Sequence, residues 1–376
     1  MHTRVSDLLG VEYPILAFSH CRDVVAAVTN AGGFGVLGAT AHTPEQLDID
    51  LGWIDDQVKG RPYGVDLLFP TLSSDIAERG ANLADAVPDA HRAFVADLLE
   101  RYGVPPLPEG DDGAPEGRQR AGLGLVDYEP LYDIAFDRHH VRLIASALGS
   151  PPAGLVERAH ASGAVVAALA GLPVHAERHT ARGVDLIVAQ GTEAGGHTGE
   201  ISTMVLVPQV VDAVAPTPVL AAGGIANGRQ VAAAMALGAE GVWCGSVWLT
   251  TAEAETHPAV KDKFLAASSR DTVRSRTLTS KPARMLKSAW TEEWDQPAAP
   301  PPLGMPLQGA LIADAQARIR RSANRRETGA WQLANYFVGQ VVGQLDGVRP
   351  ARQVVLEMVT EYADAAGRFV EQLREA

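Results

Sequence analysis

Cysteine is nearly absent from this chain, with only Cys21 and Cys244 among 376 residues. Two thiols far apart in sequence cannot form a disulfide framework or a four-thiolate zinc site. No group of Cys, His, Asp and Glu has the spacing of metal ligands, so we expect no metal centre. A Gly-x-Ser-x-Gly nucleophile elbow is missing after every early strand, which argues against a serine hydrolase of that class.

Basic side chains are also scarce. The chain has 32 Lys and Arg against 45 Asp and Glu, which gives a formal net charge of −13. This balance disfavours a nucleic-acid partner, because nucleic-acid phosphates are held by clustered basic side chains. No run reaches the roughly 18 apolar residues that a membrane span needs, and the N-terminus lacks the apolar segment of a signal peptide. We therefore expect a cytoplasmic protein with no membrane partner.

Eight short apolar runs, each bounded by Gly or Pro, indicate eight buried parallel strands separated by helices. The strands are expected at residues 14–18, 34–38, 63–69, 141–148, 164–169, 184–190, 218–222 and 241–247. Helical patterns lie at residues 23–31, 44–58, 152–162, 173–182, 203–214 and 228–237. Eight such units favour an α/β fold of the (β/α)8 TIM-barrel type over an open doubly wound sheet, which typically has fewer strands.

Two segments depart from this regular alternation. An insertion of about residues 70–135 follows the third strand and contains a predicted helix at 74–102 and a polar, Pro- and Gly-rich stretch at 105–122. A second break at 296–306 precedes helical patterns at 307–326, 331–345 and 352–375. We expect residues 1–256 to form the barrel and residues 257–376 to add a helical region that caps it or forms a homodimer contact.

Three glycine-rich loops follow the last three predicted strands, where the active site of such a barrel is built. The first runs from Gln190 through four glycines and His197. The second contains Gly223 and Gly224 before a helix that opens at Asn227 and Gly228, where we expect free backbone N–H groups at the positive end of the helix dipole. The third spans residues 243–246. The second and third of these loops follow the seventh and eighth strands, and loops at these two places commonly hold phosphate in barrels of this kind. We therefore expect a phosphorylated cofactor or substrate.

Histidine is the candidate for proton transfer. His197 lies in a glycine-rich loop at the expected catalytic face, whereas a lone histidine elsewhere is more often structural. His20, at the end of the first strand, is the second candidate. His160, His175 and His179 fall in helical stretches and are expected at the surface. We interpret Cys244 as a small residue at a strand end, with a reactive thiol as the alternative.

The sequence resembles the nitronate monooxygenase family, formerly called 2-nitropropane dioxygenases. The likeness is carried by three segments at residues 188–197, 218–225 and 236–246 and extends to 30–35, 62–67, 270–274, 282–284 and 339–343. It implies an FMN-containing barrel in which an alkyl nitronate is oxidised with O2. It also implies that His197 is the catalytic residue and that FMN is held by Gln190, Gly195, Gly196, Gly223, Gly224, Trp243, Cys244, Gly245 and Ser246.

Two positions depart from the family pattern beside the expected flavin. Asp66 stands where the family usually has asparagine, which replaces an amide donor by a carboxylate that, if ionised, can only accept, and so alters contacts to the flavin ring or its neighbours. Residues Phe18, Ser19 and His20 stand where Ala-Pro-Met is usual. We assign all four to the cofactor site, and we expect these changes to affect the choice of substrate more than the choice of cofactor.

The resemblance leaves a second function open. Residues 193–204 are equally similar to FMN-dependent enoyl-acyl-carrier-protein reductases, and flavin quinone reductases belong to the same group. Such an enzyme would take NAD(P)H and reduce an enoyl thioester or a quinone, and the insertion could provide room for these molecules. A flavin- or phosphate-binding protein without catalysis, or a barrel lyase without flavin, is the third reading, and the intact His197 loop argues against it.

Overall fold

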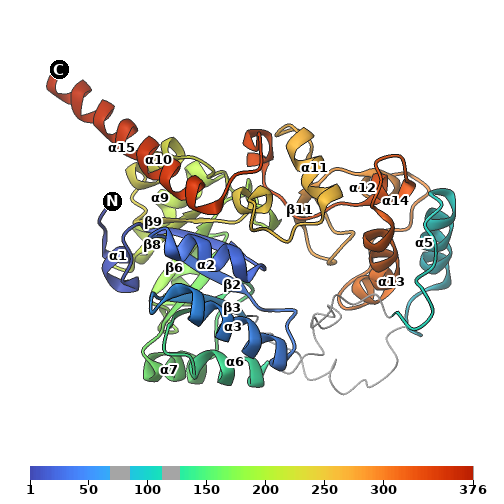
Figure 1. Ribbon diagram of the computed structural model, residues 1–376, viewed down its shortest axis with the longest axis horizontal. Helices are drawn as coiled ribbons and strands as arrows, with labels where there is room; N and C mark the ends of the chain where they lie inside the picture. Colours follow the sequence, from blue (N-terminus) through green and yellow to red (C-terminus); the bar gives the residue numbers. More distant parts are fainter. Residues whose placement is uncertain (68–84, 112–127, 376) are drawn as a thin grey trace.

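A closed barrel of eight parallel strands forms the core of the protein (Figure 1), as the sequence predicts. The structure is a computed structural model that describes residues 1–67, 85–111 and 128–375. The strand order is β1-β2-β3-β4-β5-β6-β8-β9, closed by pairing of β9 with β1. The strands are β1 (Ile15–Ser19), β2 (Phe34–Gly38), β3 (Tyr63–Leu67), β4 (Val141–Ser146), β5 (Val165–Ala170), β6 (Leu186–Gln190), β8 (Val219–Ala222) and β9 (Gly241–Cys244).

Helices follow most of the barrel strands, and α3 shows a side-chain cap at its start. Thr43 caps α3 through the backbone N–H of Gln46, and proline occupies the first helical position, where its missing N–H costs nothing. The outer helices are α2 (Arg22–Asn30), α3 (Pro44–Val58), α6 (Glu129–Phe136), α7 (Ala153–Ser162), α8 (Pro173–Thr180), α9 (Thr203–Val214) and α10 (Gly228–Ala236). A short 3-10 helix, η1 (Ser246–Thr250), follows β9.

Side chains along each barrel strand alternate between the lumen and the surrounding helices. The lumen is filled by an apolar cluster that includes Leu16, Phe34, Leu143 and Leu220. Helix α1 (Arg4–Leu9) adds Val5 and Leu9 to this cluster and closes the end at which the strands begin. A ligand can therefore reach the lumen only from the opposite end, where the strands finish.

A second lobe flanks the mouth of the barrel (Figure 1). It contains a small antiparallel sheet that the sequence did not predict, in which β11 (Ala283–Leu286) pairs with both β10 (Thr272–Ser275) and the two-residue strand β7 (Gly196–His197). The lobe also contains α5 (Asp89–Arg101), α11 (Pro258–Ala266), α12 (Ala289–Trp294), α13 (Leu307–Ser322) and α14 (Gly329–Leu333). Small strands thus accompany the predicted helices, and the boundary near residue 256 stays a prediction.

Two expected helices differ in extent. In the insertion, α5 begins only at Asp89, and the earlier part of the expected helix and most of the polar stretch lie outside the described residues. The continuous helix expected over 331–345 is wrong. The chain leaves helix after Leu333, forms a β-bridge between Phe337 and Met285, and resumes as the 3-10 helix η2 (Gln340–Gln344). Pairing with β11 satisfies this backbone in place of helical hydrogen bonds.

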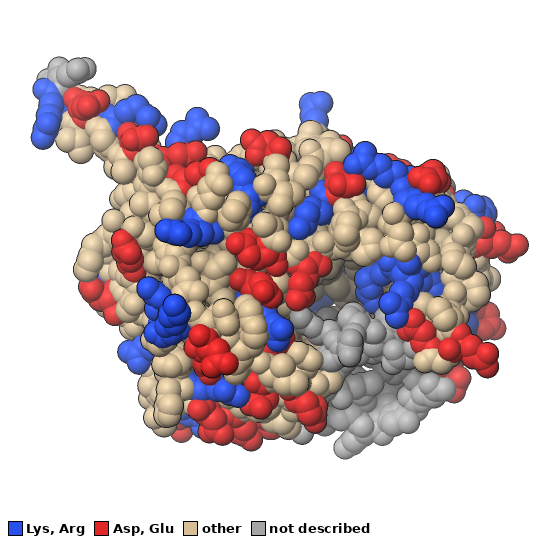
Figure 2. All heavy atoms as spheres, in the orientation of Figure 1, with Lys and Arg blue, Asp and Glu red and all other residues tan. Residues whose placement is uncertain are grey.

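The C-terminal helix α15 (Ala351–Glu375) packs its first half on α10 and α2 and then projects from the body (Figure 1). Acidic and basic side chains are intermixed on the face shown in Figure 2. Among the described helices, none combines the length and the apolar character that crossing a bilayer requires.

Candidate active site

Aromatic side chains form one wall of the barrel mouth. Phe18 of β1 stacks on Trp243 of β9 with ring centroids 6.1 Å apart, and it meets His20 edge-on at 5.1 Å. The Nδ1–H of His20 donates to the carbonyl oxygen of Gly38 over 2.8 Å. This contact fixes the ring beside the mouth, and Nδ1 carries a hydrogen because a carbonyl oxygen can only accept.

Asp66 lies at the end of β3 on the lumen side of the barrel. Val65 and Leu67, its neighbours in the strand, belong to the outer apolar cluster, so the alternation of the strand turns Asp66 inward. The residue is 1% exposed, and its Oδ1 atom has no hydrogen-bond partner among the residues that the structure describes. Burial raises the pKa of this carboxyl to about 8, although a backbone hydrogen bond from Ala147 opposes the shift. This shift favours the neutral acid at pH 7.

The His197 loop (residues 191–202) is anchored on both sides of the histidine. The carboxylate of Glu193 accepts hydrogen bonds from the backbone N–H and the hydroxyl of Thr203, at 2.9 Å each. The guanidinium of Arg284, which is 8% exposed, donates through Nε to the carbonyl oxygen of Thr192 at 2.8 Å, and Arg274 donates to that of Thr198 at 3.2 Å. These anchors hold the loop against the small sheet.

His197 is half-buried in β7, opposite Ala283 of β11. Its Nε2 atom is 2.8 Å from the hydroxyl oxygen of Thr279, and its ring faces that of Phe337 at 6.3 Å. Burial, and to a smaller extent the positive charge of Lys281, lowers the pKa of His197 below its usual value. The imidazole is therefore neutral and able to accept a proton at neutral pH.

Glycines bring the loops after β6, β8 and β9 together. A Cβ atom on Gly195 would lie 2.8 Å from the backbone nitrogen of Gly339, and one on Gly223 would lie 2.9 Å from the carbonyl oxygen of Gly191. The backbone nitrogen of Gly339 in turn donates to the hydroxyl of Ser246 at 2.8 Å. These glycines serve close backbone packing, which no larger residue permits.

The remaining glycines leave open space at the mouth. Gly224 has a φ of +73°, and the atoms nearest to a Cβ placed there belong to the side chain of Glu193, at 3.5 Å or more. A Cβ on Gly245 would meet only Phe18, at 3.8 Å, and one on Gly196 would meet nothing within 4 Å. Within the described residues, the backbone N–H of Gly224 and that of Ser246 donate to no backbone carbonyl. N–H groups without a backbone acceptor, beside open space, form a cradle suited to an anion.

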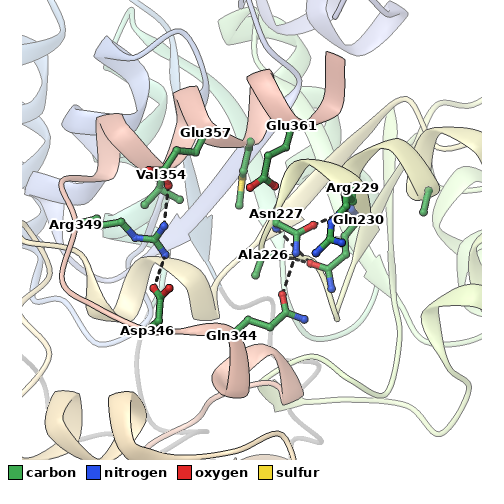
Figure 3. Close-up of a pocket in the computed structure, with 12 residues that line it drawn as sticks. Ala226, Asn227, Arg229, Gln230, Gln344, Asp346, Arg349, Val354, Glu357 and Glu361 are labelled. Atoms are coloured by element: carbon green, nitrogen blue, oxygen red, sulfur yellow. Dashed lines mark hydrogen bonds and ion pairs between the residues drawn. The ribbon is translucent and has the colours of Figure 1, made fainter. Parts of the chain in front are cut away.

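The start of α10 does not contribute to this cradle, contrary to the expectation of free N–H groups there. Asn227 and Gln230 form a reciprocal capping box, and Glu361 of α15 accepts from the N–H of Gly228 at 2.8 Å. A cavity of about 620 Å³ lies beside this cap, between α10, η2 and α15 (Figure 3). Its walls contain the Arg349 ion pairs with Asp346 and Glu357 and no residue of the His197 loop, so it is separate from the barrel mouth.

Three residues predicted for the cofactor site, Cys244, Ser19 and Gln190, are each the last residue of a barrel strand. Cys244 is 2% exposed within the outer apolar cluster, and burial raises the pKa of its thiol to about 12, which disfavours a reactive thiolate. The hydroxyl of Ser19 accepts from the backbone N–H of Cys21. Gln190, the last residue of β6, is half-buried at a lumen position of its strand. His179, expected at the surface, is 3% exposed and bonded to Ser150.

Residues that no pattern in the sequence singled out complete the surroundings of His197. Thr279 bonds its ring, and Phe337 packs against it. Both come from segments more than 80 residues away in sequence, so local pattern offers no signal for them. Arg284 and Gly339 did have a signal, because both lie in segments that carry the family resemblance.

Comparisons with known proteins agree with this architecture. The family model described as "Nitronate monooxygenase" matches residues 2–361. The chain is 63% identical over 374 residues to a Mycobacterium tuberculosis protein named "Putative monooxygenase", with 98% of each chain covered. It is 29% identical over 351 residues to a "Probable nitronate monooxygenase" of Staphylococcus saprophyticus, with 88% of this chain and 91% of the relative covered.

Solved structures resemble the whole chain. Nitroalkane oxidase from Streptomyces ansochromogenes matches with a TM-score of 0.78 and 25% identity, covering 97% of this chain and 99% of its own. FabK from Thermotoga maritima matches with a TM-score of 0.71 and 25% identity, covering 100% and 99%.

Proposed function

The chain belongs to the nitronate monooxygenase family and is an oxidoreductase, and from this premise we propose that it uses FMN to oxidise alkyl nitronates with O2. The observation that carries the proposal is the placement of a neutral histidine, His197, on a loop that also borders the open glycine cradle. Proton-accepting and anion-binding groups thus share one mouth, as oxidation of a nitro compound beside a phosphorylated cofactor requires.

The described residues fit FMN in three respects, two of which concern the glycine cradle and the aromatic wall. The N–H groups of Gly224 and Ser246 suit a phosphate. A Cβ atom on Gly196 would meet nothing within 4 Å, and one on Gly245 would meet only Phe18, at 3.8 Å, so space adjoins these N–H groups. The aromatic wall of Phe18 and Trp243 offers an apolar surface for a flat ring. Bound FMN would supply the redox centre that takes two electrons from the organic substrate and passes them to O2.

Asp66 is the third point of fit. Buried polar atoms are normally hydrogen-bonded, and a ligand in the lumen can provide the partner that Oδ1 of Asp66 lacks among the described residues. In its neutral form the carboxyl has one O–H donor, and in this respect it replaces the amide donor of the asparagine usual at this position. We therefore propose that Asp66 binds the cofactor as a protonated acid.

The role of Asp66 predicts how FMN affinity depends on pH. As pH rises through about 8 the acid loses its proton, so the donor disappears and a charge enters the lumen. The ratio of the FMN dissociation constant of the wild type to that of Asp66→Asn should stay constant below this pH and then rise about tenfold per pH unit. Fluorescence titrations of both proteins give this ratio. Ionisation of the FMN phosphate affects both dissociation constants equally, so it does not change their ratio. A ratio that stays flat from about pH 6 to 9.5 would remove the protonated-acid assignment.

His197 would act on the substrate at the same mouth. Its unprotonated nitrogen accepts the Cα proton of a neutral nitroalkane, and the electron pair of the broken C–H bond moves onto the nitro group. A nitronate already lacks that proton, so with this substrate His197 serves only to orient the negatively charged group. Oxygen-uptake measurements with a preformed alkyl nitronate test the activity directly; we expect FMN-dependent oxygen consumption, and none under saturating nitronate would contradict the proposal.

The second candidate is an NAD(P)H-dependent reductase acting on an enoyl thioester or a quinone. The resemblance of residues 193–204 to enoyl-acyl-carrier-protein reductases supports it, as does the full-length match with FabK. Both candidates use the same cofactor cradle and differ in the source of electrons.

A further inference from the structure

His197 is held by a short chain of hydrogen bonds that ends on the backbone. Its Nε2 atom lies 2.8 Å from Oγ1 of Thr279, and the same hydroxyl lies 3.2 Å from the carbonyl oxygen of Lys281. A threonine hydroxyl has one hydrogen, and a carbonyl oxygen can only accept. When the hydroxyl donates to Lys281, it must accept from His197, so Nε2 carries the hydrogen.

We propose that Thr279 is a positioning residue that keeps neutral His197 in the Nε2–H tautomer and so makes Nδ1 the atom that accepts the substrate proton. Within the described residues, Nδ1 has no hydrogen-bond partner and is not among the buried polar atoms that lack one. The Nδ1 lone pair is thus accessible from outside the protein. The role of Nδ1 as the base rests on the proposed function, whereas the tautomer assignment rests only on the hydrogen bonds.

The turn that carries Thr279 is built rigidly. The next residue, Ser280, has a φ of +69°, in the left-handed region that a non-glycine residue seldom adopts. Its backbone N–H donates to the carbonyl oxygen of Arg276 at 2.9 Å, and Nε of Arg276 donates back to the carbonyl of Ser280 at 2.8 Å. The fully buried amide of Gln308 holds the carbonyl of Thr277 at 2.8 Å. A strained residue persists where its surroundings fix it. The fixed conformation of Ser280 therefore helps to place the Thr279 hydroxyl beside His197.

The same hydrogen bond serves both protonation states of the histidine. When Nδ1 takes the proton, the Cα–H bond of the nitroalkane breaks, its electron pair moves onto the nitro group, and a new Nδ1–H bond forms. The Nε2–H bond to Thr279 is kept throughout, and it is stronger once the imidazole is positively charged. In the opposite tautomer, Nδ1 would already carry a hydrogen and could not act as the base.

Backbone pairing of β7 with β11 positions the main chain of His197 independently of Thr279. Thr279→Val replaces the hydroxyl by a methyl group of similar size. The strand should therefore stay in place, and only the preference of His197 for the Nε2–H tautomer should be lost. Thr279→Ser, which keeps the hydroxyl, is the matched control.

The test is ¹⁵N NMR of histidine-labelled, FMN-loaded protein, with the His197 signals identified by their loss in His197→Asn. We expect the Nε2–H tautomer in the wild type and in Thr279→Ser, and a mixture of tautomers in Thr279→Val with the other histidine signals unchanged. In parallel, kcat/KM for a neutral nitroalkane should fall about tenfold or more in Thr279→Val, the effect of losing one hydrogen bond to a charged group, and should change little for a nitronate.

An Nδ1–H tautomer in the wild type, an unchanged tautomer in Thr279→Val, or no rescue by serine would overturn the proposal. The NMR result does not depend on the substrate. If the tautomer shifts as expected while no variant affects nitroalkane turnover, the proposed function fails and the positioning role of Thr279 stands.

Discussion

Replacing His197 by asparagine is expected to slow turnover of a neutral nitroalkane by about 10²-fold or more, the usual contribution of a general base. Asparagine cannot accept the Cα proton at neutral pH, whereas it can still bond Thr279 through its amide. Turnover of a preformed nitronate should fall far less, because that substrate has no proton to lose. Steady-state kinetics with both forms of one nitro compound measure the difference.

The control for this variant is its flavin content. His197 borders the cradle through Gly196 but donates nothing to the predicted phosphate position, so His197→Asn should bind FMN as the wild type does. Equal losses for the neutral and anionic substrates, with FMN content unchanged, would remove the base assignment.

Gly224→Val is expected to abolish flavin retention, with FMN affinity reduced about 10²-fold or more, equivalent to one or two lost hydrogen bonds to a charged phosphate. A branched side chain at a φ of +73° strains the backbone and also fills the space in front of the N–H group. The FMN released on denaturation of the purified protein, measured by fluorescence, reports the loss.

A control must separate the effect of backbone strain from the loss of the phosphate cradle. Gly163 provides this control, because it has a φ of +83° but ends α7 and precedes β5 at the opposite end of the barrel. Gly163→Val should lower the thermal stability to a similar degree and retain FMN. Normal FMN content in Gly224→Val, or loss of FMN in both variants, would contradict the placement of the phosphate.

The barrel could be predicted because each of its strands has a recognisable local sequence pattern. Each strand is a short apolar run bounded by glycine or proline, so the eight runs located all eight barrel strands. The same alternation could have sharpened the site: Trp243 and Cys244 are adjacent in β9, so their side chains cannot both face the lumen. The structure puts Trp243 in the lumen cluster and Cys244 in the outer one.

The surroundings of His197 could not be predicted because they depend on contacts distant in sequence. Strand β7 has only two residues, too few for any periodicity, and it exists because β11 pairs with it. The helix expected over 331–345 failed for the same reason, since pairing of Phe337 with Met285 overrides a helical pattern. Burial of His179 likewise follows from its bonds to Ser150 and to the carbonyl of Leu169.

The most direct test of the central claim is the visible absorption spectrum of the FMN-loaded protein, recorded anaerobically before and after addition of NADH, NADPH or an alkyl nitronate. If the organic substrate is the electron donor, the flavin band stays oxidised with either nicotinamide and bleaches with the nitronate. Rapid bleaching by a nicotinamide together with no response to the nitronate would contradict the account and identify the enzyme as a reductase.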